Sequence, residues 1–336
     1  MFDKEILEKY DPQGMHKVYD RWPQIAKDAC ESDLETIDFK DIDHVVFSGM
    51  GGSGTIGDLF SSILSKTDIH TTVVKGYVLP KTVDENTLVV ITSVSGDTVE
   101  TLSTLESASK KNCNIICFSS GGMIESFCIK NNIQFRKIPK IHSPRASFPN
   151  FVYSILKTLN SIIPIDKQEI IQSISLLENI SQKISSTNLS ETNPSLDLAT
   201  CINGVPVIYY PWGLHAAAIR FKNSLQENAK THVIVEDIIE SGHNGIVSWE
   251  KPSGMVPVII QGTDDHIKTK ERWKLMHQYF DENNINYKEI FSVDGGILSK
   301  ILCLIYLLDY SSIYYAVRLG IDPSPIKSID FIKKRL

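Results

Sequence analysis

The sequence predicts an α/β protein made of two doubly wound halves, each with a parallel sheet flanked by helices. Short runs rich in Val and Ile alternate with helical stretches along most of the chain. The runs are almost continuously apolar, which is typical of strands buried on both faces of a parallel sheet. A polar stretch rich in Ser and Asn, residues 185–197, separates a first series of these units from a second.

The first series follows a mixed helical opening. Strands are expected at residues 44–49, 71–76, 87–95, 114–120 and 133–139. Helical periodicity then runs through 148–160 and 166–184. We therefore expect an N-terminal domain over residues 1–160 and a helical and polar connection over 161–200.

The second series has a similar order of elements without repeating the sequence of the first. Strands are expected at residues 206–210, 232–237, 256–262 and 287–293, and helices at about 214–229, 264–283 and 297–319. These elements predict a C-terminal domain over residues 201–336.

Composition excludes several classes of protein. The 336 residues are 42% hydrophobic and carry a formal net charge of −6, with no basic tract of the kind that binds nucleic acid. The longest apolar run, residues 301–308, is far shorter than the ~20 residues that span a bilayer, which indicates a core helix. The first residues are acidic where a secretory signal is basic and then apolar, so we expect a cytoplasmic protein.

The six cysteines are scattered, mostly within apolar segments. Cys113 and Cys117 fall in an expected strand, where they cannot converge on a metal ion as helix neighbours do. Buried thiols and no metal site are expected.

Residues 47–60, FSGMGGSGTIGDLF, match the dinucleotide fingerprint G-x-G-x-x-G between an expected strand and an expected helix. Backbone N–H groups and the helix dipole favour an anion at such a turn. A dinucleotide site also needs an acidic residue at the end of the next strand to bind the ribose. Lys75 and Gly76 stand there instead, which argues against a dinucleotide.

Residues 91–102, ITSVSGDTVETL, form a second strand-to-helix turn and carry three hydroxyl side chains, Ser93, Ser95 and Thr98. Hydroxyls at a helix start suit a phosphate monoester, so the two turns together predict one phosphate bound by Gly51, Gly52, Ser53, Ser93, Ser95 and Thr98. The alternative is helix capping, with Asp97 and Glu100 as a capping-box variant. Residues 117–127 repeat the Ser/Gly chemistry more weakly.

Several blocks resemble the sugar isomerase (SIS) domain family and, within it, the bifunctional phosphoglucose/phosphomannose isomerases. They are GMGGSGTIGDL, SVSGDTVETL, PRASFPNFVYSIL, RFKNSLQENAK, SGHNGI, DYSSIYYAVRLGIDPSPI and IDFIKKRL, in the order of the family and over almost the whole chain. The resemblance implies two SIS-type doubly wound subdomains and a metal-independent aldose–ketose isomerase without a cofactor, acting on glucose 6-phosphate, fructose 6-phosphate and mannose 6-phosphate.

Aldose–ketose isomerisation needs a base over C1 and C2, a donor for the enediolate oxygen and an acid/base for ring opening. Glu227 matches the base of the family; from its position near a helix end alone it could equally be a surface carboxylate. Arg145, after Pro144, matches the residue that stabilises the enediolate, the alternative being an ordinary surface arginine.

Ring opening is assigned by the same resemblance to His243, which lies between glycines, and to Lys333. In the family this His acts on the neighbouring subunit's site, which implies a homodimer. The adjacent Lys334 leaves the register of Lys333 open.

Two positions depart from the family pattern. Asp97 adds a negative charge beside the phosphate loop, and Ile326 offers no polar group to distinguish the C2 epimers.

Two other classes of protein compete with the isomerase. A non-catalytic sugar-phosphate sensor would keep the phosphate loops without needing Glu227 or His243. A nicotinamide dehydrogenase would need the ribose partner that the first turn lacks.

Overall fold

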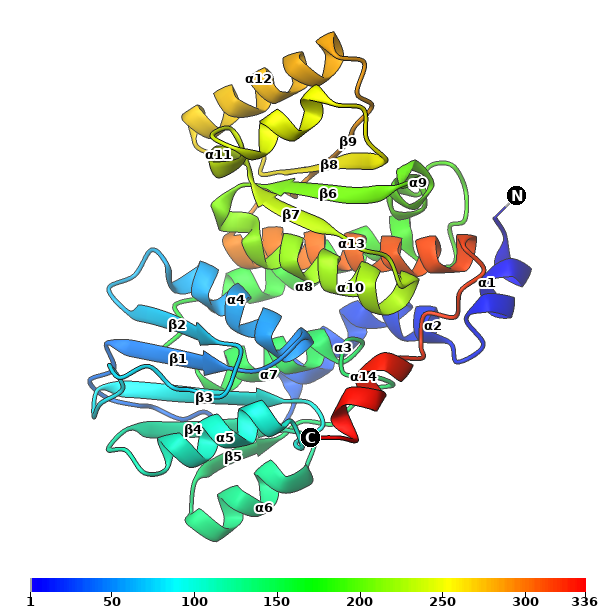
Figure 1. Cartoon of the computed structure of the whole chain (residues 1–336). Coiled ribbons are helices and arrows are strands. Elements are labelled where there is room, and N and C mark those ends of the chain that lie inside the picture. The colour runs from blue at the N-terminus through cyan, green and yellow to red at the C-terminus, as the bar shows by residue number, and fades with distance from the viewer. Residues whose placement is uncertain (1) are drawn as a thin grey trace. The chain divides into compact units, whose positions relative to one another are not determined.

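The computed structural model describes residues 2–336 (Figure 1), and its backbone contacts divide the chain into two compact units. One unit contains the chain up to Asp20 together with Ile171–Ile326, and the other contains Arg21–Ile170 together with Lys327–Leu336. Neither unit is continuous in sequence. The predicted domain limits at residues 160 and 200 stay a prediction. The units differ from the predicted domains chiefly at the chain ends, because the chain up to Asp20 belongs with Ile171–Ile326 and Lys327–Leu336 belongs with Arg21–Ile170.

The unit of residues 21–170 contains a five-stranded parallel sheet with the order β2-β1-β3-β4-β5. The predicted strands are all present: β1 (His44–Ser48), β2 (His70–Val74), β3 (Thr87–Ser93), β4 (Asn114–Ser119) and β5 (Gln134–Lys137). β1 and β3 are buried at every residue, as their unbroken apolar runs predict for central strands.

Helices cover both faces of this sheet (Figure 1). They are α3 (Trp22–Glu31), α4 (Gly52–Leu64), α5 (Val99–Ala108), α6 (Gly122–Asn131) and α7 (Phe148–Thr158), with α14 (Lys327–Lys333) at the chain end. Val46 and Val89 pack with residues of α5 and α6. Phe47, one residue on and therefore on the other face, stacks on Phe60 of α4 with ring centroids 5.5 Å apart.

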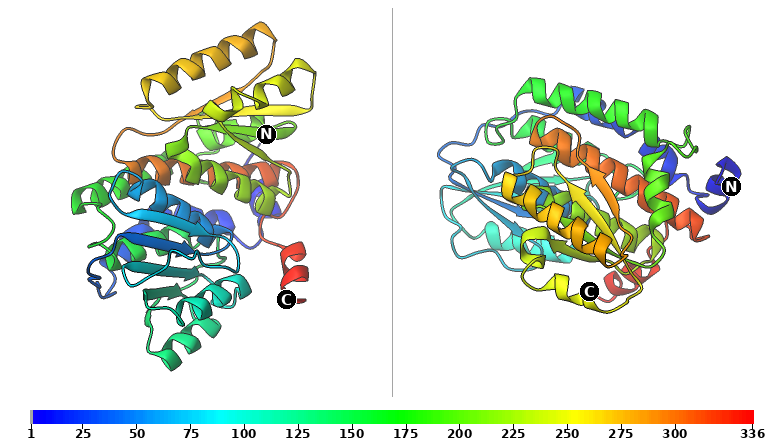
Figure 2. Two further views of the ribbon diagram at one scale, coloured as in Figure 1. Left: turned by 60° about the vertical axis from the view of Figure 1, so that its left-hand side comes forward. Right: turned by 90° about the horizontal axis from the view of Figure 1, so that it is seen from above.

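The other unit contains a four-stranded parallel sheet with the order β7-β6-β8-β9. Its strands are β6 (Val205–Tyr210), β7 (Ile234–Asp237), β8 (Met255–Gln261) and β9 (Lys288–Phe291). Its principal helices are α10 (His215–Ala229), α12 (Ile267–Glu282) and α13 (Ile297–Arg318), with α1 (Lys4–Tyr10), α2 (Met15–Asp20), α9 (Pro194–Cys201), α11 (Ile238–Ser241) and most of α8 (Lys167–Ile184) around them. α12 lies on one face of the sheet, and α10 and α13 lie together on the other (Figure 2).

Helix α9 begins inside the polar segment 185–197, which belongs to the predicted helical and polar connection. The Asn193 side chain accepts hydrogen bonds from the N–H groups of Ser195 (2.9 Å) and Leu196 (3.0 Å), and Pro194 occupies the first helical position. An Asn cap followed by Pro is a helix-start signal, so the information was present in the sequence.

Helix α13 is the core of this unit. It is long and apolar enough to cross a membrane by length and composition, but 94% of its apolar window is buried inside the structure, as expected for a core helix. Three tyrosines one turn apart anchor it to the rest of the unit. Their hydroxyls donate to the Tyr19 carbonyl from Tyr306 (2.7 Å), to the Asp20 carboxylate from Tyr310 (2.6 Å) and to the Ile184 carbonyl from Tyr314 (2.7 Å).

The cysteines are all free thiols. Cys117, Cys128 and Cys303 are buried as expected, whereas Cys30, Cys113 and Cys201 are only partly buried. Within residues 2–336, no group of three or more His, Cys, Asp or Glu side chains is placed to hold a metal ion.

Candidate active site

The carboxyl ends of β1 and β3 lie side by side at one edge of the five-stranded sheet. The strand order reverses between them, and doubly wound sheets bind their ligands in the crevice at such a switch point. One predicted phosphate turn leads from β1 into α4 and the other from β3 into α5. The topology therefore places all the predicted phosphate-binding residues at this edge: Gly51, Gly52, Ser53, Ser93, Ser95 and Thr98.

The first turn places the start of α4 at this edge. Gly51 precedes α4 with φ 53° and ψ −122°, a conformation that side chains disfavour, and no side chain caps the helix. The first N–H groups of a helix have no partner inside it and carry the positive end of the dipole. The Ser53 N–H bonds the Met50 carbonyl at 3.1 Å, which fixes the turn while the exposed Gly51 leaves its approach open.

The second turn is organised by its own hydroxyl groups. The Ser93 hydroxyl accepts from the Gly96 N–H (3.1 Å) and lies 3.0 Å from the Thr98 hydroxyl. The Ser95 hydroxyl accepts from the Asp97 N–H at 3.3 Å. Thr98 is the N-cap of α5 and its side chain makes no capping bond. The hydroxyls are therefore held close together, and the capping alternative for Asp97 and Glu100 is not the arrangement found.

Asp97 faces a neighbouring helix instead of its own. Its Oδ1 accepts a hydrogen bond from the Met123 N–H, in the first turn of α6, at 2.9 Å. An anion at a helix N-terminus is stabilised by the dipole, so the extra carboxylate of this sequence caps α6. The negative charge of Asp97, beside the predicted phosphate turn, is thus directed at the start of α6.

The Ser/Gly turn after β4 supports the second phosphate turn by close packing. A Cβ atom at Gly96 would lie 1.8 Å from the Gly121 carbonyl oxygen, so only glycine fits there. The Ser119 hydroxyl bonds both the N–H (3.2 Å) and the carbonyl (2.9 Å) of Gly121. These bonds give the weaker Ser/Gly motif a structural role.

Lys75, which stands where a dinucleotide site needs an acid, is bound to α4. Its Nζ donates to Oδ2 of Asp58, which is buried, at 2.6 Å. The end of β2 thus presents a paired ammonium group rather than a carboxylate for a ribose.

Arg145 lies in the turn before α7 and is 3% exposed, so it is not an ordinary surface arginine. The turn is held at both sides of it. The Ser147 hydroxyl accepts from the Ile141 N–H (2.8 Å), and the Trp22 indole N–H donates to the Ala146 carbonyl (3.1 Å). A buried guanidinium on a fixed turn suits the recognition of an anionic oxygen.

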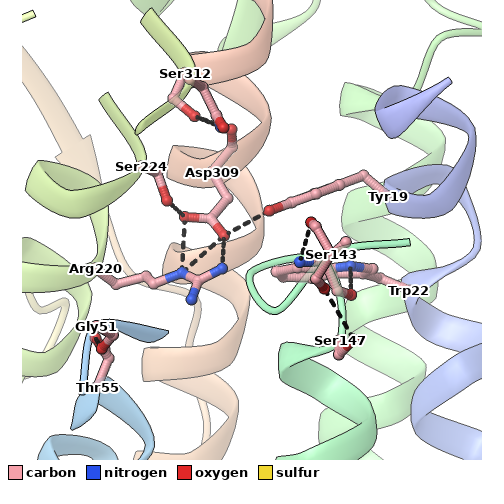
Figure 3. A network of polar contacts seen from close by, with 12 residues as sticks. Tyr19, Trp22, Gly51, Thr55, Ser143, Ser147, Arg220, Ser224, Asp309 and Ser312 are labelled. Carbon is pink, nitrogen blue, oxygen red and sulfur yellow. Dashed lines mark hydrogen bonds and ion pairs between the residues drawn. The ribbon is translucent and has the colours of Figure 1, made fainter. Parts of the chain in front are cut away.

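Glu227 lies in the last turn of α10 and is partly buried. Two turns earlier on the same helix, Arg220 forms a buried ion pair with Asp309 of α13, with an Nη2–Oδ2 distance of 2.7 Å. Figure 3 shows Ser224 and Tyr19 completing the network, with hydroxyl–carboxylate distances of 2.5 Å and 3.1 Å. These bonds fix α10 against α13 just before the turn that carries Glu227.

The Arg220 guanidinium stays charged in this setting. Burial lowers its pKa, but Asp309 raises it, helped by Tyr19 and Glu227, and the net shift is upward. The main partner of this charge is the Asp309 carboxylate.

His243 lies in the turn between α11 and the 3₁₀ helix Gly245–Glu250, and its side chain is exposed. The Asp237 side chain caps α11 by accepting from the Ile239 N–H at 2.8 Å. The Asn244 amide donates to Glu240 at 2.8 Å. The backbone on both sides of His243 is therefore fixed while the imidazole is accessible.

A buried carboxyl group lies beneath this turn. Oε2 of Glu236, on β7, is buried without a hydrogen-bond partner among the described residues, and a Cβ atom at Gly245 would lie 2.2 Å from it. Burial raises the pKa of Glu236. Its ionised form is consequently destabilised in the fold.

Replacing Glu236 with Gln is expected to stabilise the protein at neutral pH. A carboxyl group whose pKa is raised by folding contributes its full stability below the unfolded value, about 4.3, and loses it as the pH rises through the folded pKa. The gain of Glu236→Gln over wild type should thus be largest at pH 7 and vanish near pH 4 in thermal unfolding. The exposed Glu250→Gln is the control; an equal gain at both pH values would contradict the assignment.

Lys333 is the last residue of α14 and is exposed. It belongs to the same unit as the phosphate turns and Arg145, whereas Glu227 and His243 belong to the other. Sequence reasoning missed the roles of Asp309 and Glu236, because neither residue carries a local signal.

Comparisons with known proteins agree with this architecture. Residues 191–336 match the family model for the bacterial phospho-glucose isomerase C-terminal SIS domain. The fold is similar to a hypothetical protein from Thermus thermophilus (TM-score 0.74, 12% identity, 98% of this chain and 92% of that one). It is also similar to tagatose-6-phosphate ketose/aldose isomerase from Escherichia coli (TM-score 0.67, 12% identity, 95% and 93%). The fold is thus that of a double SIS-type α/β protein.

Relatives in sequence identify the family within this fold class. The chain is 31% identical to a bifunctional phosphoglucose/phosphomannose isomerase of Caldicellulosiruptor bescii, over 97% of this chain and 96% of that protein. It is 30% identical to one of Aquifex aeolicus, over 96% of each. A D-glucosamine-6-phosphate 4-epimerase of Sulfolobus acidocaldarius is 26% identical over 96% and 97%. The chain belongs to the bifunctional phosphoglucose/phosphomannose isomerase family.

Proposed function

We propose that this protein is an aldose–ketose isomerase that interconverts glucose 6-phosphate and mannose 6-phosphate with fructose 6-phosphate through an enediol. The observation that carries the proposal is the pair of strand-to-helix turns at the β1/β3 switch point, one opening a helix that no side chain caps and one with clustered hydroxyls. A phosphate monoester accepts hydrogen bonds from both kinds of donor. Family membership supports the sugar as the rest of the substrate.

The chemistry is assigned to four side chains. With the ring open, the Glu227 carboxylate takes the C2 proton of the aldose and delivers a proton to C1 of the enediol, while the O2 hydroxyl proton passes to O1, giving the ketose. Arg145 stabilises the negative oxygen that develops between these steps. His243 and Lys333 exchange protons with the ring oxygen and the anomeric hydroxyl, so that the ring opens and closes. None of these steps needs a metal ion or an organic cofactor.

We further propose a cytoplasmic homodimer in which His243 completes the site of the neighbouring subunit. Large apolar side chains are exposed at the carboxyl ends of three strands of the second sheet: Trp212 (74%), Ile239 (38%) and Phe291 (54%). Exposed apolar groups gathered in this way mark protein interfaces, and the accessible His243 follows Ile239 by four residues. The mass of the chain in solution by light scattering tests the dimer.

The proposed function is tested by turnover of the purified wild-type chain on glucose 6-phosphate and mannose 6-phosphate, with and without EDTA. We expect fructose 6-phosphate from both, unaffected by the chelator. Loss of turnover in EDTA would overturn the metal-free mechanism. D-glucosamine 6-phosphate is the comparison substrate. Conversion of this substrate alone would assign the protein as an epimerase instead of an isomerase. Binding of sugar phosphate without turnover would favour a sensor.

The phosphate turn gives a separate prediction. Ser95→Ala removes one hydroxyl donor, and a hydrogen bond to a charged group contributes about 1.5–3 kcal/mol. We expect KM for glucose 6-phosphate to rise about tenfold or more, with kcat within a few-fold of wild type. Competition by inorganic phosphate should weaken in parallel. Ser65→Ala, at the exposed end of α4, is the matched control; an unchanged KM in Ser95→Ala would remove this residue from the site.

A further inference from the structure

Lys230 ends α10 in a backbone conformation that its side chain does not favour. It is the C-cap residue, with φ 57° and ψ 33°, in the left-handed region. Helices commonly end in this conformation with glycine. Within residues 2–336, the other non-glycine residues with positive φ are of the types that tolerate it best: Asp41, Asn132, His142 and Asn284. A lysine held there indicates that its side chain performs a task.

The Lys230 side chain joins two segments of its unit. Its Nζ donates to the carbonyl oxygens of Glu227 (2.6 Å) and, more weakly, Asn228 (3.3 Å) in the last turn of α10. The same ammonium group lies 2.8 Å from the carbonyl oxygen of Pro325 and 3.4 Å from that of Asp322. One cation therefore bridges the end of α10 and the segment before α14.

Lys230 lies where a cation can offset the unfavourable electrostatic environment of the proposed base, Glu227. The last carbonyl groups of a helix have no partner inside it and carry the negative end of the dipole, so a carboxylate there is disfavoured and its turn tends to fray. Lys230 supplies a positive charge and donors to these same carbonyls. On the other side, the Asn228 amide donates to the Ser312 hydroxyl of α13 at 2.8 Å. The backbone that carries Glu227 is thus held from two directions.

We propose that Lys230 is a positioning residue for Glu227: its ammonium group fixes the last turn of α10 to the Asp322–Pro325 segment and so holds the carboxylate over the reacting carbons. The inference rests on the proposed function, in which Glu227 is the base. Small displacements of a catalytic group lower the rate of the chemical step strongly, whereas the phosphate turns that bind substrate do not depend on Lys230. Loss of Lys230 should therefore reduce kcat and spare KM.

The test is Lys230→Gly, assayed on glucose 6-phosphate together with thermal unfolding. Glycine adopts the left-handed conformation freely, so the fold should survive while the bridge is lost. We expect kcat to fall about tenfold or more, with KM within threefold of wild type. Lys230→Arg keeps the charge, the donors and the backbone strain, and should retain most of kcat. Asn132→Gly, at the left-handed end of α6, is the matched control for the glycine change and should keep wild-type kcat.

Wild-type kcat in Lys230→Gly would overturn the inference, as would equal losses in Lys230→Gly and Lys230→Arg, or a loss confined to KM. Lys230→Met keeps the side-chain length without the charge and gives the same test if the glycine variant does not fold. An inactive wild type, or an active Glu227→Gln, would instead refute the proposed function. With wild type active and Glu227→Gln inactive, the Lys230 variants test this inference alone.

Discussion

Glu227→Gln is expected to abolish isomerisation of glucose 6-phosphate while leaving sugar-phosphate binding intact. The amide has the shape of the carboxylate but cannot take the C2 proton, and a positioned general base contributes about 10²–10⁴-fold to a rate. We expect kcat to fall by at least this factor in a coupled assay of fructose 6-phosphate formation. Binding of substrate, followed by calorimetry, should change by less than about threefold, because the proposed phosphate turns are expected to supply most of the binding energy.

Two further measurements make this result specific. Glu227→Asp keeps a carboxylate base on a side chain that is one carbon shorter, so this variant should be faster than Glu227→Gln and slower than wild type. Exchange of the C2 proton with solvent deuterium should disappear in Glu227→Gln together with turnover. Wild-type exchange in that variant would assign the base to another residue, and loss of binding would indicate that Glu227 supports the fold or the substrate instead.

Asp309→Ala is expected to destabilise the unit built around α13 by about 3–5 kcal/mol, the cost of breaking a buried ion pair on one side. Asp309 is fully buried and Arg220 is 1% exposed, so the substitution leaves a charge without its counter-ion where water cannot reach. Ser224 and Tyr19 lose their acceptor as well. Urea unfolding followed by tryptophan fluorescence and circular dichroism measures the loss.

The double variant Arg220→Met with Asp309→Leu removes both charges and should lose much less stability than Asp309→Ala alone. Asp294→Ala, an exposed acid in the same unit, should stay within about 0.5 kcal/mol of wild type. A double variant as unstable as Asp309→Ala would mean that packing, rather than the stranded charge, determines the loss.

The strands and most helices were predictable because burial imposes a local period on the sequence. The unbroken apolar runs of β1 and β3 are the pattern of central parallel strands. The two strand-to-helix turns were predictable for a similar reason, since glycine and hydroxyl residues mark the change from strand to helix, and phosphate binding by these turns stays a prediction. The start of helix α9 also has a local signal, since Asn193 caps the helix and Pro194 follows it.

Other features depend on residues far apart in the chain. Nothing next to Asp309 in the sequence indicates Arg220, 89 positions away, and the raised pKa of Glu236 follows from burial that no local pattern reveals. Asp97 could not be assigned between its own helix and a neighbour until the first turn of α6 was placed beside it.

The alternation of strands and helices, the two glycine- and hydroxyl-rich turns and the family blocks can be read from the sequence, because periodicity and turn chemistry are local properties of the chain. Three features appear only in the folded chain: the turns meet at the β1/β3 switch point, Asp309 neutralises Arg220, and Lys230 bridges α10 to Pro325. These are contacts between distant segments, and their energies depend on burial and distance, which exist only once the chain is folded.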